Sequence, residues 1–269
     1  MAVFTRRGIV KPPYNPRLER YWHQRRHLFS RYEEGIKIDD PEAWYSVTPE
    51  AVAKASAGLI AQGAPAGGAL FVDAFVGVGG NAIQQALADP AGFVIAIDLD
   101  PSKVAMAKHN ASIYGVAERI DFVVGDASQL LPHMRAHVCL LSPPWGGIAD
   151  VAHPPNAPSH SSAFRLTQLA QPCCGLRLFD LAARCAPSIA YYLPADTAED
   201  ELARLAMRHT SHICDKVGMR WGGGKRKSAR VRAILAVFHA RPPAWLVGAM
   251  QGATTAVHSR SWDVATDAD

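Results

Sequence analysis

From residue 69 onward, short apolar runs alternate with amphipathic segments, and this alternation constrains the fold more than any other feature. The runs are rich in Val, Ile, Leu and Phe and have the length of buried strands. The predicted strands are 69–75, 92–98, 120–126, 137–144 and 188–194, with helices at 82–88, 101–115 and 198–209 between them. Two more strands are predicted within 212–238, around a glycine-rich basic turn. Strands that alternate with helices predict an α/β fold with a parallel sheet, and the last two strands predict an antiparallel edge.

The composition is that of a folded, water-soluble chain. Of the 269 residues, 49% are hydrophobic and 19% are charged, so a large core is expected and global disorder is excluded. The formal net charge of +4 leans slightly towards anionic partners. No apolar segment reaches the roughly 18 residues of a membrane span, and the N-terminus does not resemble a signal peptide. The five cysteines lack metal-binding spacing, so we expect reduced thiols, no metal ion and no membrane partner.

The chain divides into three predicted regions. Residues 1–63 form an N-terminal extension, 64–241 the α/β core, and 242–269 a tail that we expect to be flexible. Within the extension, residues 17–32 show helical spacing of aromatic residues, and their basic face suits either solvent or RNA phosphates. A second helix is predicted to begin near Thr48, with Thr48 as its cap and Pro49 in its first turn.

Acidic residues end the first three predicted strands of the core. Asp73 precedes a turn that contains Gly77 and Gly79, Asp98 ends the second strand, and Asp126 ends the third. Glycines in such a turn let the backbone approach a ligand, and an acid at the second strand can accept both hydroxyls of a ribose. Three carboxylates would repel a pyrophosphate but suit a cationic nucleoside such as S-adenosylmethionine (SAM). The alternative is that each acid only caps the helix that follows it.

Several blocks of the sequence resemble one family of enzymes. "DAFVGVGGN" (73–81), "IAIDLDPSKVAMAKHNASIYGV" (95–116), "DFVVGD" (121–126) and "LSPPWGG" (141–147) are similar to blocks of class I SAM-dependent methyltransferases. Together with "RYWHQRRHLFSRYEEGIKIDDPEAWYSVTPE" (20–50), they resemble the trimethylguanosine synthase family, which methylates N2 of the 7-methylguanosine RNA cap. The likeness extends from about residue 20 to 238, most of the chain.

The resemblance implies a fold and a cofactor site. It implies a seven-stranded, Rossmann-like sheet of order 3-2-1-4-5-7-6, with SAM lying across the first two strands. It places Asp73 near the methionine end of SAM, Asp98 on the ribose and Asp126 on the adenine amine. Phe29 matches an aromatic residue that packs on the adenine, although core packing is the alternative, and Thr48 matches a residue near the cofactor. The full set of expected cofactor residues is Phe29, Thr48, Asp73, Gly77, Gly79, Asn81, Asp98, Leu99, Asp126 and Ala127.

The stretch Ser142–Pro143–Pro144–Trp145 follows the fourth strand and is the candidate catalytic platform. The exocyclic amine of a purine is a poor nucleophile because its lone pair is delocalised into the ring. The Ser142 hydroxyl and the Pro143 carbonyl can accept its hydrogens and aim the lone pair at a methyl group, since proline fixes the backbone direction. Trp145 can stack on a purine made cationic by N7 methylation. The alternative is that Trp145 closes the end of the core.

The resemblance also implies contacts with the cap. Arg20 lies where a basic residue grips phosphate, Asn110 matches a residue that contacts the cap base, and Lys225 and Lys227 lie in the basic turn. A plain surface role for Asn110 and a nuclear-targeting or solvated role for the basic turn are the alternatives. Two positions depart from the family pattern: Ala195 stands where Arg is usual, and Asp150 lies about where Tyr is usual. These departures leave the grip on the triphosphate and the number of methyl groups open.

The sequence thus predicts an enzyme that uses SAM to methylate the cap guanine at N2, giving the 2,7-dimethyl and then the 2,2,7-trimethyl form. The extension is expected to act as a lid. The expected substrates are m7G-capped small nuclear or nucleolar RNAs, in the nucleus, and the expected state is a monomer. The alternatives are an enzyme that stops after one transfer, a guanine-N2 or adenine-N6 methyltransferase of other RNA, and a non-catalytic cap-binding protein.

Overall fold

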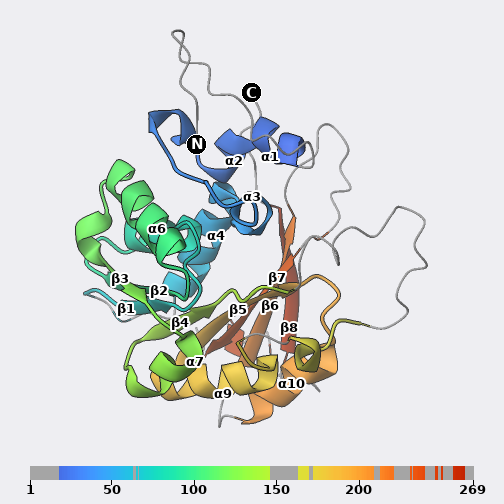
Figure 1. The fold of residues 1–269 in the computed structure, drawn as a ribbon. Helices are drawn as coiled ribbons and strands as arrows, with labels where there is room; N and C mark the ends of the chain where they lie inside the picture. Colours follow the sequence, from blue (N-terminus) through green and yellow to red (C-terminus); the bar gives the residue numbers. More distant parts are fainter. Residues whose placement is uncertain are drawn as a thin grey trace, which may run out of the picture.

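One mixed eight-stranded sheet forms the centre of the protein, as seen in a computed structural model (Figure 1). The structure describes residues 18–62, 65, 67–145, 163–169, 172–208, 213–220, 231, 233–239, 246–247, 250 and 257–263. The strands are β1 (Leu70–Asp73), β2 (Phe93–Asp98), β3 (Ile120–Val124), β4 (Val138–Leu141), β5 (Ser188–Pro194), β6 (Ile213–Arg220), β7 (Ala233–His239) and β8 (Val257–Asp263).

The strand order is β3-β2-β1-β4-β5-β7-β6-β8. The five strands from β3 to β5 are parallel to one another, whereas β7 runs antiparallel to both β5 and β6. This order confirms the predicted 3-2-1-4-5-7-6 sheet and its antiparallel pair. It also brings the ends of β1, β2, β3 and β4 to one edge, because the carboxyl ends of parallel strands meet.

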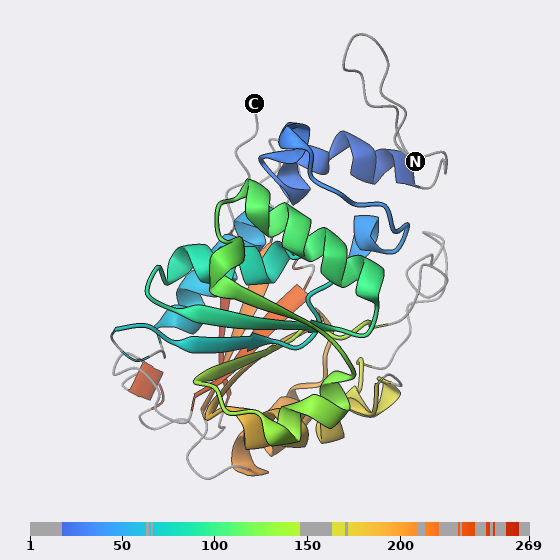
Figure 2. The same ribbon diagram turned by 60° about the vertical axis from the view of Figure 1, so that its left-hand side comes forward.

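Helices cover both faces of the sheet (Figures 1 and 2). The helices on the first face are α4 (Glu50–Ala61), α5 (Gly80–Ala88) and α6 (Pro101–Ile113), with α1 (Glu19–His23), α2 (Arg25–Leu28) and α3 (Ala43–Ser46) above them. On the other face are α7 (Ala127–Leu130), α9 (Gly175–Cys185) and α10 (Glu199–Arg208). Short 3-10 turns lie at Tyr32–Glu34, Ala117–Arg119, Leu131–His133 and Leu166–Gln168.

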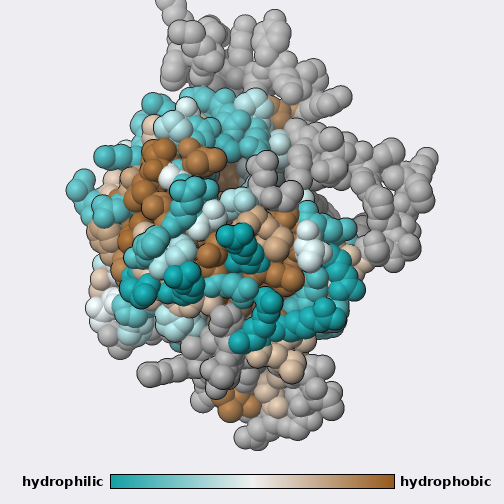
Figure 3. Space-filling view, turned by 60° about the horizontal axis from the view of Figure 1, so that its bottom comes forward, coloured by the Kyte–Doolittle hydropathy of each residue, from teal (hydrophilic) through white to brown (hydrophobic). Residues whose placement is uncertain are grey.

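The strands divide their side chains between two cores, because successive residues of a strand point to opposite faces. In β5, Ala190 and Tyr192 join the core under α4, whereas Ile189, Tyr191 and Leu193 join the core above α9. Hydrophilic and hydrophobic areas alternate over the outer surface on the α9 side (Figure 3). Both faces of the sheet are therefore covered, as the continuous apolar character of the central strands predicts.

The N-terminal extension differs from its prediction. The single helix predicted over 17–32 is broken at Gln24 and ends at Leu28, and Phe29 is extended. The break lets Trp22 pack against Tyr32 and Trp44, each with ring centroids 5.9 Å apart. Tertiary packing of these aromatic side chains has overridden the local helical pattern.

The predicted cap of the next helix is also wrong. The N-cap residue of α4 is Pro49, with no side-chain cap, so Thr48 lies one residue before the cap. The Thr48 hydroxyl therefore does not cap α4, although the sequence predicts that it does. The first helical residue, Glu50, instead accepts hydrogen bonds from other segments, as described below.

The extension is fastened to α6 by polar contacts. Lys103 Nζ lies 2.8 Å from a Glu42 carboxylate oxygen and 3.4 Å from one of Asp40. Six residues further along α6, His109 Nε2 hydrogen-bonds with the Gly35 carbonyl over 2.9 Å. These contacts hold residues 35–42 along one side of the helix.

The expectation of a flexible tail is wrong for Val257–Asp263. This segment forms β8, which pairs in parallel with β6. The Arg260 guanidinium donates to both carboxylate oxygens of Asp215, which is almost completely buried in β6. A buried carboxylate requires such a partner, so this ion pair explains why the C-terminal segment joins the sheet.

We expect Gln85→Met to stabilise the protein. Gln85 is buried in α5, and neither its amide nitrogen nor its amide oxygen has a hydrogen-bond partner among the described residues. An orphaned buried polar group costs about 1–3 kcal/mol, so methionine should raise the free energy of unfolding by about that amount. Chemical denaturation measures the change, and exposed Gln62→Met is the matched control. A loss of stability in Gln85→Met would contradict this reading.

Candidate active site

The turn between β1 and α5 is a glycine-rich loop at the carboxyl edge of the sheet. Gly77 and Gly79 have φ angles of 52° and 97°, which favour glycine because other residues lack room there. A Cβ on Gly79 would also come within 3.2 Å of the Ala107 Cα, so α6 packs directly on the turn. The turn is tied to the next strand by the bond from the Val76 N–H to the Ile97 carbonyl, 2.8 Å long.

Asp98, at the end of β2, lies beside this turn. Its two carboxylate oxygens accept the Gly77 N–H (2.9 Å) and the Asp100 N–H (3.0 Å). Each oxygen retains a further lone pair, and the residue is half-buried. The carboxylate is therefore oriented by the backbone and remains able to accept the two hydroxyls of a ribose.

Asp73, at the end of β1, is completely buried. One of its oxygens accepts the Phe75 N–H over 3.3 Å, and the other has no hydrogen-bond partner among the described residues. Burial raises the pKa of Asp73 from 3.8 to about 7, and the nearby charge of Asp98 adds to this, although backbone N–H groups oppose it. A carboxyl group in this state fits a cationic ligand, since a positive charge would stabilise its ionised form. The residues at this edge thus fit SAM.

The raised pKa of Asp73 predicts a pH dependence of stability. The folded protein binds this proton more tightly than the unfolded chain, so the contribution of protonated Asp73 to stability is fully present below about pH 4 and is lost as the pH rises through about 7. The loss is on the order of 4 kcal/mol for a shift of this size. Asp73→Asn should therefore gain stability relative to the unchanged protein at pH 8 but not at pH 4, as measured by denaturation without SAM. An equal difference at both pH values would contradict the raised pKa.

Asp126 and its neighbours are placed at the end of β3 as predicted. Asp126 caps α7, since one carboxylate oxygen accepts both the N–H and the hydroxyl of Ser128, at 2.8 and 2.7 Å. The capping alternative thus holds for this acid, while an adenine contact stays a prediction. Ala127 is buried as the first residue of α7, and Leu99, next to Asp98, is 72% exposed at the same edge. An exposed leucine there offers an apolar surface to a flat ring.

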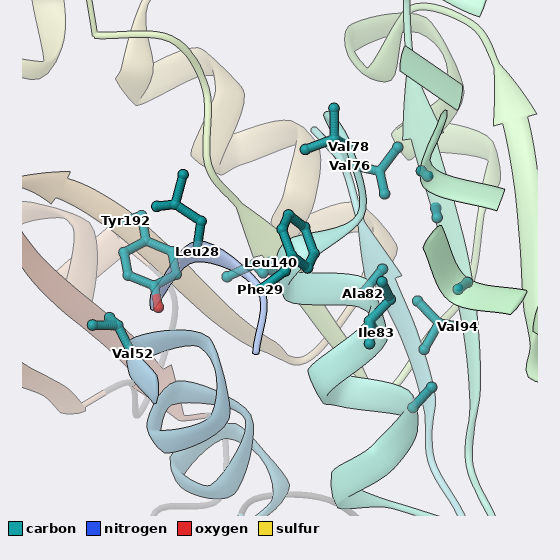
Figure 4. Close-up of a cluster of buried hydrophobic side chains, with 14 of the residues drawn as sticks. Leu28, Phe29, Val52, Val76, Val78, Ala82, Ile83, Val94, Leu140 and Tyr192 are labelled. Atoms are coloured by element: carbon teal, nitrogen blue, oxygen red, sulfur yellow. The ribbon is translucent and has the colours of Figure 1, made fainter. Parts of the chain in front are cut away.

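Phe29 packs beside the glycine turn. It is only 2% exposed and lies in the hydrophobic core (Figure 4). The centre of its ring is 6.3 Å from the centre of the Tyr114 ring. A Cβ on Gly80 would meet Phe29 Cζ at 4.0 Å and the Thr48 carbonyl at 3.4 Å. Core packing therefore describes Phe29 in this structure. Half-buried Asn81 is the second residue of α5, and the Thr48 carbonyl lies near Gly80, the first residue of that helix. A contact of Thr48, Asn81 or Phe29 with the cofactor stays a prediction.

The platform residues directly follow β4. Pro143 is buried and Ser142 half-buried, while the Trp145 side chain is 39% exposed. The indole Nε1–H donates to the Tyr192 carbonyl of β5 over 3.1 Å. Trp145 thus does not close the core: one edge is tied to the sheet and part of the ring reaches the surface.

Asn110 joins α6 to the extension and to the glycine turn. It is completely buried in α6, and its amide nitrogen donates to the carbonyls of Lys37 (3.0 Å) and Val78 (2.9 Å). Its oxygen accepts the Lys37 N–H over 2.8 Å. Both amide hydrogens are thus used within the protein in this structure. The alternative of a plain surface role is wrong because the extension covers this face of α6, while a contact with the cap base stays a prediction.

The other predicted cap contacts are only partly described. The side chain of Arg20 and the residues Asp150, Lys225 and Lys227 lie outside the described part of the chain. Ala195 directly follows β5 and is half-buried. The structure therefore neither joins these basic residues to the site nor separates them from it.

Two residues near the site escaped the sequence prediction. Glu50, the first residue of α4, accepts the Ser30 N–H (2.6 Å), the Ser30 hydroxyl (2.8 Å) and the Tyr114 hydroxyl (2.5 Å). Tyr192 provides the carbonyl that holds Trp145. Glu50 is the last residue of the block 20–50 that resembles the family but was given no role, and Tyr192 lies near the end of a predicted strand.

The order of the sheet, the glycine turn and the row of acids define a class I SAM-dependent methyltransferase. A solved SAM-dependent methyltransferase from Agrobacterium tumefaciens has a related fold, with a TM-score of 0.53 at 15% identity over 73% of this chain and 64% of that one. Residues 68–229 match the family model described as RNA cap guanine-N2 methyltransferase. The chain belongs to that family and is a SAM-dependent enzyme.

Two curated relatives are named trimethylguanosine synthase. The chain is 39% identical to the one from Schizosaccharomyces pombe, over 75% of this chain and 80% of the relative. It is 29% identical to the one from Saccharomyces cerevisiae, over 72% of this chain and 60% of the relative. These likenesses confirm the family resemblance deduced from the motifs.

The described residues hold no candidate metal site and no candidate membrane span. Among them no group of three or more His, Cys, Asp or Glu side chains could hold a metal ion. Within the same residues, no helix combines the length and the apolar character that crossing a membrane requires.

Proposed function

We propose that the protein methylates N2 of the 7-methylguanosine cap of RNA twice, giving the 2,7-dimethyl and then the 2,2,7-trimethyl form. The observation that carries this proposal is the half-exposed Trp145, fixed beside Ser142 and Pro143 at the end of β4. In the sheet, β4 lies next to β1, with Leu140 opposite Asp73. The acceptor platform therefore adjoins the edge that fits SAM. The names of the two yeast relatives support the double transfer.

The platform residues act mainly by positioning. SAM, when bound, supplies an electrophilic methyl group. The Ser142 hydroxyl and the Pro143 carbonyl accept the hydrogens of the N2 amine. These two hydrogen bonds direct the lone pair of the amine towards the methyl group. The two prolines hold the backbone, so little freedom is lost when the base binds. The positive charge of the methylated base makes the N2 proton easier to lose, so no strong general base is required.

Trp145 selects the cationic base. A cation over an indole is stabilised by about 2 kcal/mol when both are desolvated, which corresponds to roughly 30-fold in affinity. A neutral guanine or adenine lacks that contribution. The indole therefore favours a guanine already methylated at N7.

The partners and the setting are part of the same proposal. We infer that the substrates are m7G-capped small nuclear or nucleolar RNAs, that the protein acts as a monomer in the nucleus, and that transfer needs no metal ion. Arg20, Lys225 and Lys227 are the proposed phosphate contacts, compensating for Ala195 and Asp150. The mild positive charge of the chain supports an RNA partner.

Incubation with isotopically labelled SAM and either m7GTP or GTP tests the proposal, with the products resolved by mass. We expect two added methyl groups on m7GTP and none on GTP. A single added methyl would limit the enzyme to the dimethyl product. Equal transfer to GTP would remove the selection of the cation and favour the alternative of a methyltransferase that acts on other RNA.

A further inference from the structure

We propose that Ser56 of α4 and Tyr192 of β5 are positioning residues that set the orientation of Trp145. This inference rests on the proposed function, because it concerns how the platform receives the cap base. Its starting point is the bond from the indole Nε1–H to the Tyr192 carbonyl. That bond joins residues 47 positions apart in the chain and is the only polar contact of the indole among the described residues.

The Tyr192 carbonyl is available because β4 is shorter than β5. The last residue of β4, Leu141, pairs with Tyr191, so the ladder between the two strands stops one residue before Tyr192. The chain then leaves the sheet through Ser142 and the prolines, and the indole N–H takes the next carbonyl along β5. The angle of the indole thus depends on where the Tyr192 backbone lies.

The Tyr192 side chain anchors that backbone to α4. It is only 2% exposed, and its ring points towards the helix that carries Val52 (Figure 4). Its hydroxyl hydrogen-bonds with the hydroxyl of buried Ser56. Because the Ser56 hydroxyl donates to the Val52 carbonyl over 2.8 Å, Tyr192 is the donor to Ser56. A directed chain of hydrogen bonds therefore leads from the sheet to the backbone of α4.

The same helix is tied to the cofactor side of the site. Glu50, at the start of α4, holds Ser30 of the extension and Tyr114, which follows α6. Thus α4, the last helix of the extension, connects the cofactor edge with the strand that orients Trp145. Through this connection the extension acts as a scaffold for the acceptor platform, in addition to the lid role predicted from the sequence.

Single and double variants separate positioning from stability. Ser56→Ala leaves the Tyr192 hydroxyl buried without an acceptor, and Tyr192→Phe leaves Ser56 without its donor; both should lower thermal stability. The double variant Ser56→Ala/Tyr192→Phe removes both groups, so stability should recover at least in part. If the two residues orient the indole, the KM for m7GTP should stay raised by about tenfold in the double variant, since small displacements at a reacting site have large effects. The affinity for SAM should not change.

Two matched controls remove a hydroxyl of the same type, one from the same strand and one from another helix. Tyr191→Phe removes the neighbouring buried hydroxyl, which donates to the Gly175 carbonyl on the other side of the sheet. Ser112→Ala removes a serine hydroxyl that donates to the carbonyl of His109, at the surface of α6. Both controls should leave the KM for m7GTP unchanged.

A readout that needs no activity is the indole N–H signal of Trp145 in NMR spectra, assigned by its loss in Trp145→Phe. We expect it to shift and to exchange faster with solvent in the double variant but not in the controls. The inference would be overturned if the KM for m7GTP and the indole signal both returned to those of the unchanged protein in the double variant, together with the stability. Absence of transfer by the unchanged protein would instead overturn the proposed function, and the indole signal would still test the positioning.

Discussion

Trp145→Ala is expected to abolish measurable transfer to the m7G cap while SAM binding remains intact. The variant removes the aromatic surface that is 39% exposed beside Ser142 and Pro143. Loss of a desolvated cation–π contact alone corresponds to about 30-fold in kcat/KM. Misplacement of the amine adds to this, because the base loses the surface that aligns it with the methyl group. Steady-state kinetics with m7GTP and calorimetry with SAM measure the two effects separately.

Trp145→Phe is the informative comparison. Phenylalanine keeps an aromatic face but loses the N–H that donates to the Tyr192 carbonyl. We expect an intermediate kcat/KM, with weaker discrimination between m7GTP and GTP, since indole binds cations better than a phenyl ring. Activity of Trp145→Ala equal to that of the unchanged protein would remove stacking from the mechanism.

Asp98→Ala is expected to weaken SAM binding by about 10- to 100-fold. Hydrogen bonds to a charged group contribute about 1.5–3 kcal/mol, and each 1.4 kcal/mol is tenfold in affinity. The variant loses the acceptor for the ribose and also leaves the Gly77 N–H without its partner, so the glycine turn loses an anchor. Calorimetric titration with SAM measures the change.

Two other acids serve as references for this result. Asp121 is exposed on β3, so Asp121→Ala should leave SAM affinity unchanged. Asp126 caps α7, and Asp126→Ala should cost about 0.5–2 kcal/mol of stability. A SAM affinity that is the same in Asp98→Ala and Asp121→Ala would contradict the assignment of Asp98 to the ribose.

The cofactor edge was predictable because it depends on a local rule. Asp73 and Asp98 end β1 and β2, Asp126 follows β3 by two residues, and the carboxyl ends of neighbouring parallel strands always meet. The alternating pattern of strands and helices was sufficient to predict the parallel sheet. The platform was predictable for a similar reason, since Trp145 follows β4 within a few residues.

Other assignments failed where distant segments decide the outcome. The aromatic residues of 17–32 have helical spacing, but Trp22 packs on Trp44, and the helix breaks. Asn110 has the spacing of a helix surface, but the extension covers it and uses its amide. A tail with no clear pattern became β8 because Asp215, more than forty residues earlier, supplies a partner for Arg260.

The sequence by itself determined the type of sheet, the acids at its edge and the presence of an indole on a rigid turn, because these follow from neighbours along the chain. Only the tertiary structure decided what each polar group binds. The Tyr192 carbonyl under Trp145, Ser56 under Tyr192 and Glu50 between Ser30 and Tyr114 are contacts across distant segments. Burial makes such partners obligatory, but it does not reveal which residue will supply them until the chain has folded.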